Sequence, residues 1–341
     1  MTLKDIARVL GVSPSTVSRV ISGTGNNFTV KPELRRQILD YVKECGYQPN
    51  QAYQAMRKKD NQQISIIMGN HWGTTSEASV THAIQQLCNV LFDEGFSFHY
   101  LIRITEQFAS YGLPQWKVAG AVAVDVRHPR VIEELNSSKI PYVVLNGVSG
   151  SRGNAVQSDE VFNMNLALEH LFELGHRKIV YVNAYRSPEL MKIPYCESHY
   201  SVLKRAEAYF DFCRTHDLIP QETAGSCSFS NKEVVERGIA SGATAYVTYS
   251  FESYMEVCHH LRQNGFDIPA DVSVICFNNP ISAFSVPPAT CLDVPFTEMG
   301  LAAGRLLLEQ IRDPRKSPVT EMYPGRLIIR ESTASVPKNK K

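Results

Sequence analysis

The residues with the most evident chemical use lie between positions 13 and 21, where hydroxyl side chains surround one arginine. Small hydroxyl side chains let a helix approach base edges closely, and an arginine can donate two hydrogen bonds to O6 and N7 of guanine. At helical spacing these side chains lie away from the apolar face, and they are Ser15, Thr16, Ser18 and Arg19. The stretch predicts a helix that enters the DNA major groove. The alternative is a capped helix on the protein surface.

Two short helices joined by a tight turn would position this stretch. Ser13 can cap a helix by accepting a backbone N–H bond, and Pro14 suits the first helical position. Its apolar residues recur three and four positions apart, at Val17, Val20 and Ile21. Thr2 and Asp5 resemble the capping box of a preceding helix, and Gly11 can end that helix in the left-handed conformation. This order predicts a helix-turn-helix.

A third helix completes the small N-terminal unit. Pro32 opens it and Gly46 closes it, with apolar residues at helical spacing between them. Residues 1–48 contain no carboxylate pair, metal-ligand cluster or nucleophile–base pair in a catalytic pattern. We therefore expect this unit to dock onto another molecule rather than to catalyse a reaction.

The charge of the chain is unevenly distributed. Residues 1–60 contain ten Lys and Arg against five Asp and Glu, a net charge of +5. The whole chain carries +1, so the remaining residues carry −4. A basic N-terminal segment on an acidic body indicates that the segment meets a polyanion.

The rest of the chain alternates between two kinds of pattern. Buried-strand patterns occur at 64–68, 96–104, 119–126, 142–146, 178–183, 244–248 and 273–278. Helical patterns occur at 79–94, 129–138, 163–174, 198–216, 251–264 and 296–311. Such alternation predicts parallel α/β sheets with helices on both faces, and the length allows two lobes. Ligands in these folds bind at the carboxyl ends of the strands or between lobes.

Composition favours a cytoplasmic location. The eight cysteines are scattered without a CxxC pair, which indicates buried thiols in a reducing compartment. No signal-peptide pattern begins the sequence, and no apolar run is long enough to span a membrane. His170 and His176 could suggest a metal, but we interpret both as structural and expect neither metal nor cofactor.

Three ordered blocks in the N-terminal region resemble the LacI/GalR family of bacterial transcription regulators. They are residues 3–7 (LKDIA), 11–20 (GVSPSTVSRV) and 46–50 (GYQPN). The resemblance continues through residues 168–179, 268–275 and 330–333. It implies an all-α helix-turn-helix head and a two-lobed α/β body of the periplasmic-binding-protein type.

The resemblance also implies domain boundaries. The DNA-binding head would cover residues 1–48 and a hinge helix residues 49–62. The effector-binding and dimerisation body would cover residues 63–336, before a basic tail at 337–341. Its N-lobe would comprise about 63–158 and 292–320, and its C-lobe about 159–291 and 321–336.

DNA contacts follow from the same resemblance. Ser15, Thr16 and Arg19 would read bases in the major groove. Phosphate contacts would come from Thr2, Ser13, Ser18 and Asn50. The hinge would enter the minor groove with Tyr53 and with Met56, an apolar side chain able to wedge between base pairs. A hinge this short would fold on binding DNA, the alternative being a mere tether.

The effector pocket departs from the family pattern. Arg205 matches a ligand-binding arginine and Phe229 an aromatic pocket position, while Ser250, Phe251 and Asn278 stand where carboxylates and amides are usual. Trp72 offers a further wall. Since an arginine without opposing carboxylates favours an anion, we expect an anionic effector held by Arg205. The alternatives are that the pocket is degenerate and binds nothing, or that Arg205 is a helix-surface charge.

Other protein classes are weaker interpretations. The sequence lacks the GxSxG, GK[ST] and HExxH motifs, which argues against the corresponding enzymes. A solute-binding protein on the same fold would not need the basic head. The sequence therefore predicts a transcription regulator, expected to be a repressor, that binds a pseudo-palindromic operator as a homodimer.

Overall fold

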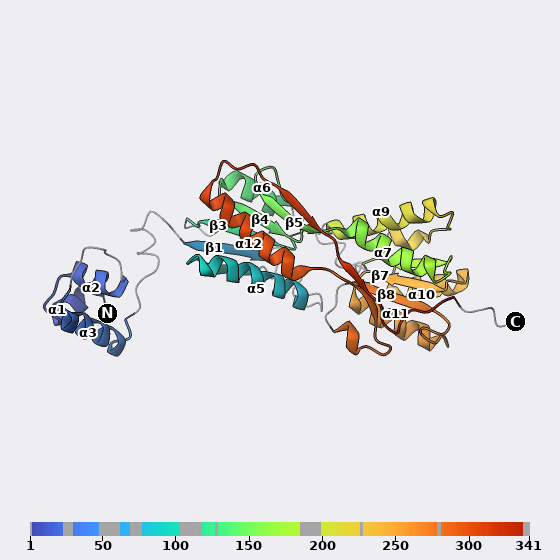
Figure 1. Cartoon of the computed structure of the whole chain (residues 1–341), viewed down its shortest axis with the longest axis horizontal. Helices are drawn as coiled ribbons and strands as arrows, with labels where there is room; N and C mark the ends of the chain where they lie inside the picture. The colour runs from blue at the N-terminus through green and yellow to red at the C-terminus, as the bar shows by residue number, and fades with distance from the viewer. Residues whose placement is uncertain are drawn as a thin grey trace. The chain divides into compact units, whose positions relative to one another are not determined.

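The computed structural model describes residues 2–22, 30–47, 62–68, 77–102, 113, 117–126, 129–184, 199–225, 228–277 and 281–336. The chain forms two compact units, residues 1–61 and residues 62–341. We call them the head and the body (Figure 1).

The head consists of three described helices around one core. They are α1 (Leu3–Val9), α2 (Pro14–Ser22) and α3 (Pro32–Glu44). The core is made of the fully or nearly fully buried side chains Ile6, Ala7, Val17, Val20 and Ile38. These residues come from all three helices, so the apolar faces predicted for the helices pack together in one core.

Local signals determine where the head helices begin and end. The Thr2 hydroxyl accepts from Asp5 N at 3.3 Å, and the Asp5 carboxylate accepts from Thr2 N at 2.9 Å, which completes the capping box. Gly11 has φ +62°, the left-handed conformation that ends α1. Ser13 accepts from Thr16 N at 3.1 Å and so caps α2.

The body contains two sheets, and the first forms the N-lobe. Its six described strands run in the order β10-β5-β4-β3-β1-β2, and every pair is parallel. The strands are β1 (Gln63–Met68), β2 (Ser97–Ile102), β3 (Gly120–Val124), β4 (Tyr142–Leu145), β5 (Asn154–Ser158) and β10 (Thr320–Tyr323).

Helices cover both faces of this sheet. On one face α5 (Glu77–Asp93) and α12 (Phe296–Arg312) share a buried core with β1, β3 and β4 (Figure 1). Gly300 allows their close packing, because a Cβ there would lie 2.1 Å from the Ala83 carbonyl oxygen. On the other face α6 (Pro129–Ser138) packs through Val131 and Leu135.

The second sheet forms the C-lobe. Its five described strands run in the order β11-β9-β8-β7-β6, parallel except for β11, which pairs antiparallel with β9. The strands are β6 (Ile179–Val182), β7 (Ala245–Thr248), β8 (Ser273–Phe277), β9 (Thr290–Asp293) and β11 (Arg326–Ile328).

The second sheet is also covered on both faces, with two described helices on each. The helices α7 (Glu160–Glu173) and α9 (Tyr200–Thr215) bury one face, and α10 (Asn231–Ser241) and α11 (Phe251–Gln263) bury the other. Two short 3-10 turns accompany them, η1 (Glu222–Gly225) and η2 (Ser282–Phe284). The predicted fold class, a helix-turn-helix head with a two-lobed α/β body, is confirmed.

The chain crosses between the sheets three times, after β5, after β9 and after β10. The later two crossings follow Asp293 and Tyr323, where β9 and β10 end.

Some elements were not predicted. The helix α10 begins with a capping box, in which Ser230 accepts from Glu233 N and Glu233 accepts from Ser230 N. Its sequence is short and contains few apolar residues, so the spacing of apolar residues does not identify it as a helix. The strands β9, β10 and β11 are three or four residues long, too short for a clear alternation. No described helix has both the length and the apolar character needed to cross a membrane.

Candidate nucleic-acid interface and interlobe site

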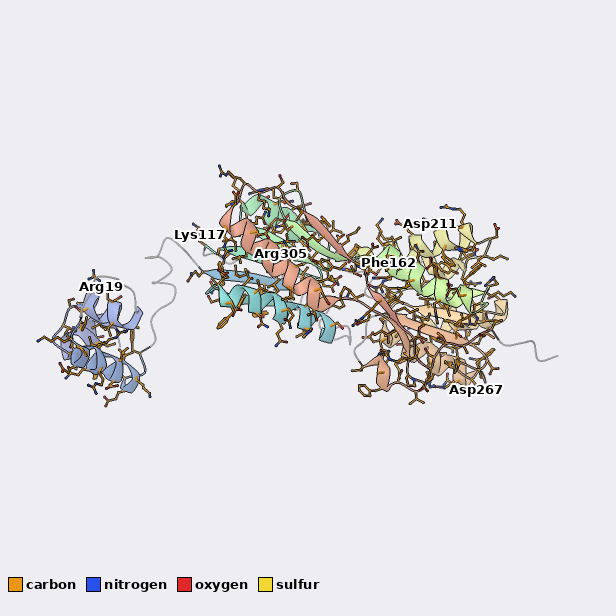
Figure 2. The ribbon with its side chains drawn as sticks, in the orientation of Figure 1. Arg19, Lys117, Phe162, Asp211, Asp267 and Arg305 are labelled. Carbon is orange, nitrogen blue, oxygen red and sulfur yellow. The ribbon has the colours of Figure 1, made fainter. Side chains whose placement is uncertain are left out.

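The helix α2 presents polar side chains on the surface of the head and apolar ones to its core. Ser15 and Arg19 are exposed, and Figure 2 shows Arg19 projecting from the head. Val17 and Val20 are buried at 0% and 7% exposure. The division into two faces agrees with the one predicted from sequence spacing, and it leaves the polar face available for a partner.

Three hydroxyl groups gather at the N-terminus of α2. The Ser13 Oγ lies 2.7 Å from the Ser15 Oγ and 2.8 Å from the Thr16 Oγ1. A helix N-terminus carries a partial positive charge, and hydroxyl groups can turn their protons toward an anion. The arrangement suits contact with a phosphate group, while Arg19 lies further along the same helix. Ser18 is half-buried.

Thr2 has a structural use within the head. Its hydroxyl lies 2.7 Å from the Asp5 carboxylate, to which it donates, and this bond lowers the pKa of Asp5 below its usual value. A phosphate contact from Thr2 would have to share or replace that bond.

Five residues with predicted roles fall outside the described part of the chain. They are Asn50, Tyr53 and Met56 of the hinge, and Trp72 and Asn278 of the effector pocket. Their roles remain predictions.

The carboxyl ends of strands from both lobes bring polar residues together, and we call this group the interlobe cluster. Asp125 follows β3 and Asn146 follows β4, both with positive φ, at +49° and +55°. From the C-lobe, His199 places its Nε2 atom 2.7 Å from the Asn146 carbonyl oxygen and 3.1 Å from the Asp125 carboxylate. The lobes are therefore bridged by side chains of the protein itself.

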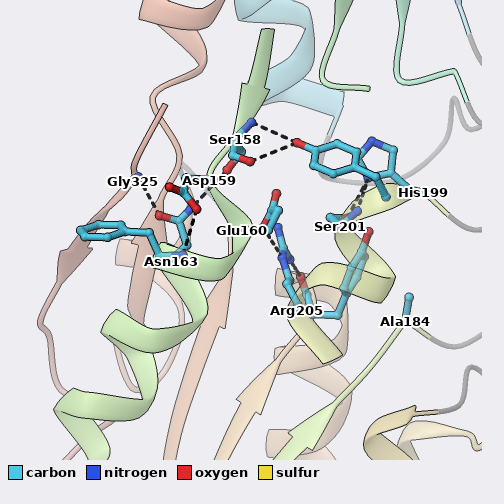
Figure 3. Close-up of polar contacts among 12 residues, drawn as sticks. Ser158, Asp159, Glu160, Asn163, Ala184, His199, Ser201, Arg205 and Gly325 are labelled. Carbon is cyan, nitrogen blue, oxygen red and sulfur yellow. Dashed lines mark hydrogen bonds and ion pairs between the residues drawn. The ribbon is translucent and has the colours of Figure 1, made fainter. Parts of the chain in front are cut away.

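The start of α9 extends the bridge. Tyr200 accepts from Ser158 N at 3.0 Å (Figure 3). It donates to Asn146 Oδ1 at 3.3 Å. The Ser201 Oγ atom lies 2.7 Å from His199 Nδ1 and 2.8 Å from the Tyr249 hydroxyl oxygen. Burial raises the pKa of Tyr200, so its hydroxyl stays protonated. The cluster thus joins both sheets through a continuous set of hydrogen bonds.

The prediction of an unopposed Arg205 is wrong. Arg205 Nε donates to the Glu160 carboxylate at 2.5 Å, and Nη1 donates to the Tyr249 carbonyl at 2.7 Å (Figure 3). The guanidinium is 3.8 Å from the centre of the Phe277 ring, and the residue is 2% exposed. Burial alone would lower the pKa of Arg205, but the charge of Glu160 raises it. Arg205 is therefore neither a surface charge nor a cation that lacks a counter-ion.

The remaining predicted pocket residues have other contacts. Ser250 accepts from Ser253 N at 3.3 Å and caps α11. Phe251 is 7% exposed and stacks on Tyr254 in the C-lobe core. Phe229 is half-buried beside the same core, with the Arg237 guanidinium 4.8 Å from its ring centre. Within the described residues, these three do not join the hydrogen-bonded cluster around His199.

Glu160, Asp125 and His199 were missed from the sequence. Asp125 directly follows a predicted strand and so carried a usable signal. Glu160 and Arg205 are 45 positions apart, and His199 and Asp125 are 74 positions apart, so no local pattern connects either pair. The packing of α7 against α9 brings the first pair together, and the approach of the two lobes brings the second.

His170 and His176, the two histidines that could suggest a metal, lie within hydrogen-bond distance of neighbouring oxygen atoms. His176 is buried, with Nδ1 2.9 Å from Thr244 Oγ1 and Nε2 3.0 Å from Ser273 Oγ. His170 Nε2 lies 3.1 Å from Thr333 Oγ1. Burial lowers the pKa of both histidines. These contacts join His176 to β8 and to the segment before β7, and His170 to the segment that follows β11.

Family comparisons match both units of the chain. Residues 2–50 match the family described as bacterial regulatory proteins, lacI family. Residues 168–333 match the periplasmic binding protein-like domain. The first matched range covers most of the head. The second covers most of the C-lobe together with α12 and β10 of the N-lobe.

Curated relatives match over nearly their whole length. The chain is 24% identical to the transcriptional repressor PurR of Actinobacillus pleuropneumoniae serotype 3 over 356 residues, which covers 99% of each protein. It is 27% identical to the transcriptional regulator MalR of Streptomyces coelicolor over 362 residues, covering 98% of this chain and 97% of MalR.

Solved structures share the fold. A lac repressor dimer bound to operator and the anti-inducer ONPF gives a TM-score of 0.77 at 18% identity, covering 98% of this chain and 99% of the repressor. A complex of the transcriptional regulator CelR with cellobiose gives a TM-score of 0.65 at 22% identity, covering 97% and 99% of the two chains.

Proposed function

Because this chain belongs to the lacI family of bacterial regulatory proteins, we propose that it is a cytoplasmic transcriptional repressor that binds a pseudo-palindromic operator as a homodimer. The observation that carries the proposal is the outer surface of α2. It combines the hydroxyl groups at its N-terminus with the exposed Arg19, above a buried apolar face. Such a helix can contact phosphates and read base edges.

The base-reading residues in this proposal are Ser15, Thr16 and Arg19. Ser13 and Ser18 contact phosphates, together with Thr2 once its bond to Asp5 is shared. Asn50 adds a phosphate contact, and Tyr53 and Met56 enter the minor groove. The match of residues 2–50 to the family supports the assignments as far as Asn50. The assignments of Tyr53 and Met56 rest on the resemblance of the hinge sequence alone.

Exposed apolar side chains support a homodimer. In the N-lobe Phe92 is 70% and Tyr100 48% exposed, and in the C-lobe Phe284 is 84% and Val286 78% exposed. An exposed apolar patch can mark a protein–protein contact. We propose that these four residues form one such patch, which we call the subunit surface, and that it pairs with the same surface of a second copy, as in a two-fold dimer.

A small-molecule effector would bind at the interlobe cluster. Glu160 neutralises Arg205, so the reason for expecting an anion is gone. The cluster offers both hydrogen-bond donors and acceptors from Asn146, His199 and Tyr200. A neutral ligand with several hydroxyl groups suits such a mixture, since hydroxyl groups donate and accept. A ligand that binds one lobe arrangement better than another would shift the spacing of the two heads.

The bridge formed by His199 and Tyr200 favours a second candidate. Because the protein's own side chains already connect the lobes, the regulator could act without an effector. Calorimetry against a panel of neutral sugars and acidic metabolites separates the two candidates. Binding of a neutral sugar supports the effector-controlled regulator, whereas no heat with any compound supports the effector-independent one.

The main proposal is tested by selecting binding sites from a random pool of DNA duplexes with the full chain. We expect enrichment of an inverted repeat with two equivalent half-sites. Enrichment of a single asymmetric site would contradict binding as a symmetric dimer. Recovery of unenriched DNA would contradict sequence-specific binding altogether.

A further inference from the structure

Two cysteines lie side by side in the C-lobe sheet, far in sequence from the α2 surface. Cys276 on β8 and Cys291 on β9 are partners in the parallel register. Both are buried, at 0% and 2% exposure, on the sheet face covered by α10 and α11. Adjacent strands lie about 4.8 Å apart, a Cα separation that a disulfide can span.

Hydrogen-bond donors surround the sulfur atom of Cys291. Arg330 Nη1 lies 3.2 Å from it, and the Ser282 hydroxyl donates to it at 3.3 Å. The same Nη1 atom is 2.9 Å from Ser282 Oγ and 2.6 Å from the Ala289 carbonyl, which keeps the guanidinium in place. An arginine next to a thiol stabilises the thiolate, which is the nucleophilic form.

Three cysteines of this lobe have different acidities. The neighbouring Cys276 thiol, followed by Ser282 and Arg330, lowers the pKa of Cys291 to about 6 despite burial. Burial raises the pKa of Cys276 well above its usual value. Burial also raises the pKa of Cys258, on α11, to about 11. Cys291 thus has an anionic form near neutral pH, next to a thiol that keeps its proton.

We propose that Cys291 is a peroxide-reactive thiolate and that Cys276 is its resolving partner. The Cys291 thiolate attacks one oxygen of a hydroperoxide, the O–O bond breaks, and the leaving alkoxide or hydroxide takes a proton from water. This step oxidises Cys291 to a sulfenic acid. The Cys276 sulfur then attacks that of Cys291 while its proton passes to the departing hydroxyl group, which forms a disulfide and releases water. Two thiols lose two electrons and one hydroperoxide gains them.

The η2 turn lies over this site and controls access to it. Ser282 in η2 is fully buried and donates to Cys291, while Ser285 Oγ donates to the Ser282 carbonyl at 2.8 Å. A hydroperoxide reaches the sulfur when this single turn opens. Access therefore needs a local opening rather than unfolding of the lobe.

Oxidation would act on the turn that covers the site. A disulfide sulfur is a weaker acceptor than a thiolate, so Ser282 and Arg330 lose their ionic partner. The same turn carries Phe284, and Val286 follows it, both in the subunit surface. Loosening the turn would displace these side chains.

Alkylation of the full-length protein tests the thiolate without any substitution. Cys258 is the matched control, because it is also 2% exposed in the same lobe. We expect iodoacetamide at pH 7 to modify Cys291 at least about tenfold faster than Cys258, measured by peptide mass spectrometry, since the thiolate is the reacting form. Equal rates at the two sites would overturn the proposal.

Peroxide treatment tests the pairing. After hydrogen peroxide, digestion under non-reducing conditions should yield a peptide in which Cys276 and Cys291 are linked. In Cys276→Ser the sulfenic acid at Cys291 should persist and be trapped by dimedone. A protein that forms neither product at peroxide concentrations that oxidise exposed thiols would overturn the proposal.

The Ser282→Ala variant tests the role of the turn. It removes one donor to Cys291 and one contact that holds the turn in place. The pH midpoint of Cys291 alkylation should move upward while the rate for Cys258 stays the same. An unchanged midpoint would show that Ser282 does not stabilise the thiolate and would contradict the described arrangement.

Discussion

The head and the interlobe cluster differ in how their residues are brought together. In the head, the polar groups of α2 lie within seven positions of one another, from Ser13 to Arg19. In the interlobe cluster, Asp125, Asn146 and His199 come from three segments and two lobes. A surface formed by one short segment can be interpreted from its sequence, whereas a site assembled by tertiary packing cannot.

The comparison also concerns what each region does with its charge. Arg19 is exposed on α2, so its charge can serve a partner molecule. Arg205 is 2% exposed and bonded to Glu160, so its charge serves the fold. We therefore expect two arginines that look equally functional in the sequence to have different uses, and mutation should separate them.

Glu160→Gln should have the largest effect. It leaves the buried Arg205 cation without a counter-charge, and breaking a buried ion pair in this way costs about 3–5 kcal/mol. Urea unfolding of the body measures the loss of free energy of unfolding. The matched control is Glu207→Gln, which breaks the exposed pair of Lys204 and Glu207 on α9 and should cost about 0–1 kcal/mol.

Equally small losses in the free energy of unfolding for the two glutamate variants would contradict the contrast drawn between Arg19 and Arg205. They would mean that Arg205 does not need Glu160 as its counter-ion. The original expectation of an anionic ligand at Arg205 would then regain its basis.

Arg19→Ala should have the next largest effect. We expect a loss of about 1–3 kcal/mol of affinity for the selected operator and a much smaller loss for scrambled DNA, because base contacts specify and phosphate contacts do not. Fluorescence titration of both duplexes measures the two losses. Arg8→Ala, an equal change of charge on α1, is the control and should weaken both duplexes alike. Arg19→Ala behaving like Arg8→Ala would contradict base reading.

Thr2→Ala and Ser230→Ala compare the same local structure in the two units. Each removes the cap hydroxyl of a capping box, in α1 and in α10, and each should cost about 1 kcal/mol. In calorimetry, the same cost should lower Tm by about 4–8 °C for a unit the size of the head and by less for the body. An unchanged head transition in Thr2→Ala would show that its capping box does not stabilise α1.

As the pH falls, the body should lose stability before the head does, and we expect the loss to be small. His176 and His170 have lowered pKa values in the fold, so below the ordinary value of 6.5 the unfolded body binds more protons and its stability falls. The head has no histidine, and the pKa of its Asp5 is lowered in the fold. The head therefore loses the stability that Asp5 contributes only below about pH 4. Melting curves at pH 7.5, 6.0 and 5.0 compare the two transitions, and an earlier loss in the head would reverse the comparison.

The sequence predicted most of the fold because most of its signals are local. The capping box at Thr2, the left-handed Gly11 and the apolar spacing of α2 each act over a few residues. The alternation of strands and helices identified two parallel sheets. The α10 capping box at Ser230 and Glu233 was an equally local signal and could have been found.

The interlobe site could not be predicted in the same way. The neighbouring ion pair of Glu160 and Arg205 depends on α7 packing against α9, and neither helix reveals in its own sequence which side chains face the other. The bridge from His199 to Asn146 depends on how the two lobes approach. Family resemblance identified Arg205, but it did not identify Glu160, and so the predicted positive charge is wrong because Glu160 neutralises it.

The crossings between the two sheets have a consequence for synthesis on the ribosome. The head is complete as a folding unit once Tyr47 has emerged, since its core uses only nearby residues. The N-lobe begins at β1 but receives α12 only after Arg312 has been made and its edge strand β10 only after Tyr323. Until α12 has been made, the apolar face that it covers is exposed, and such surfaces are prone to aggregate. A nascent chain therefore carries a folded head on an unfinished body for most of its translation.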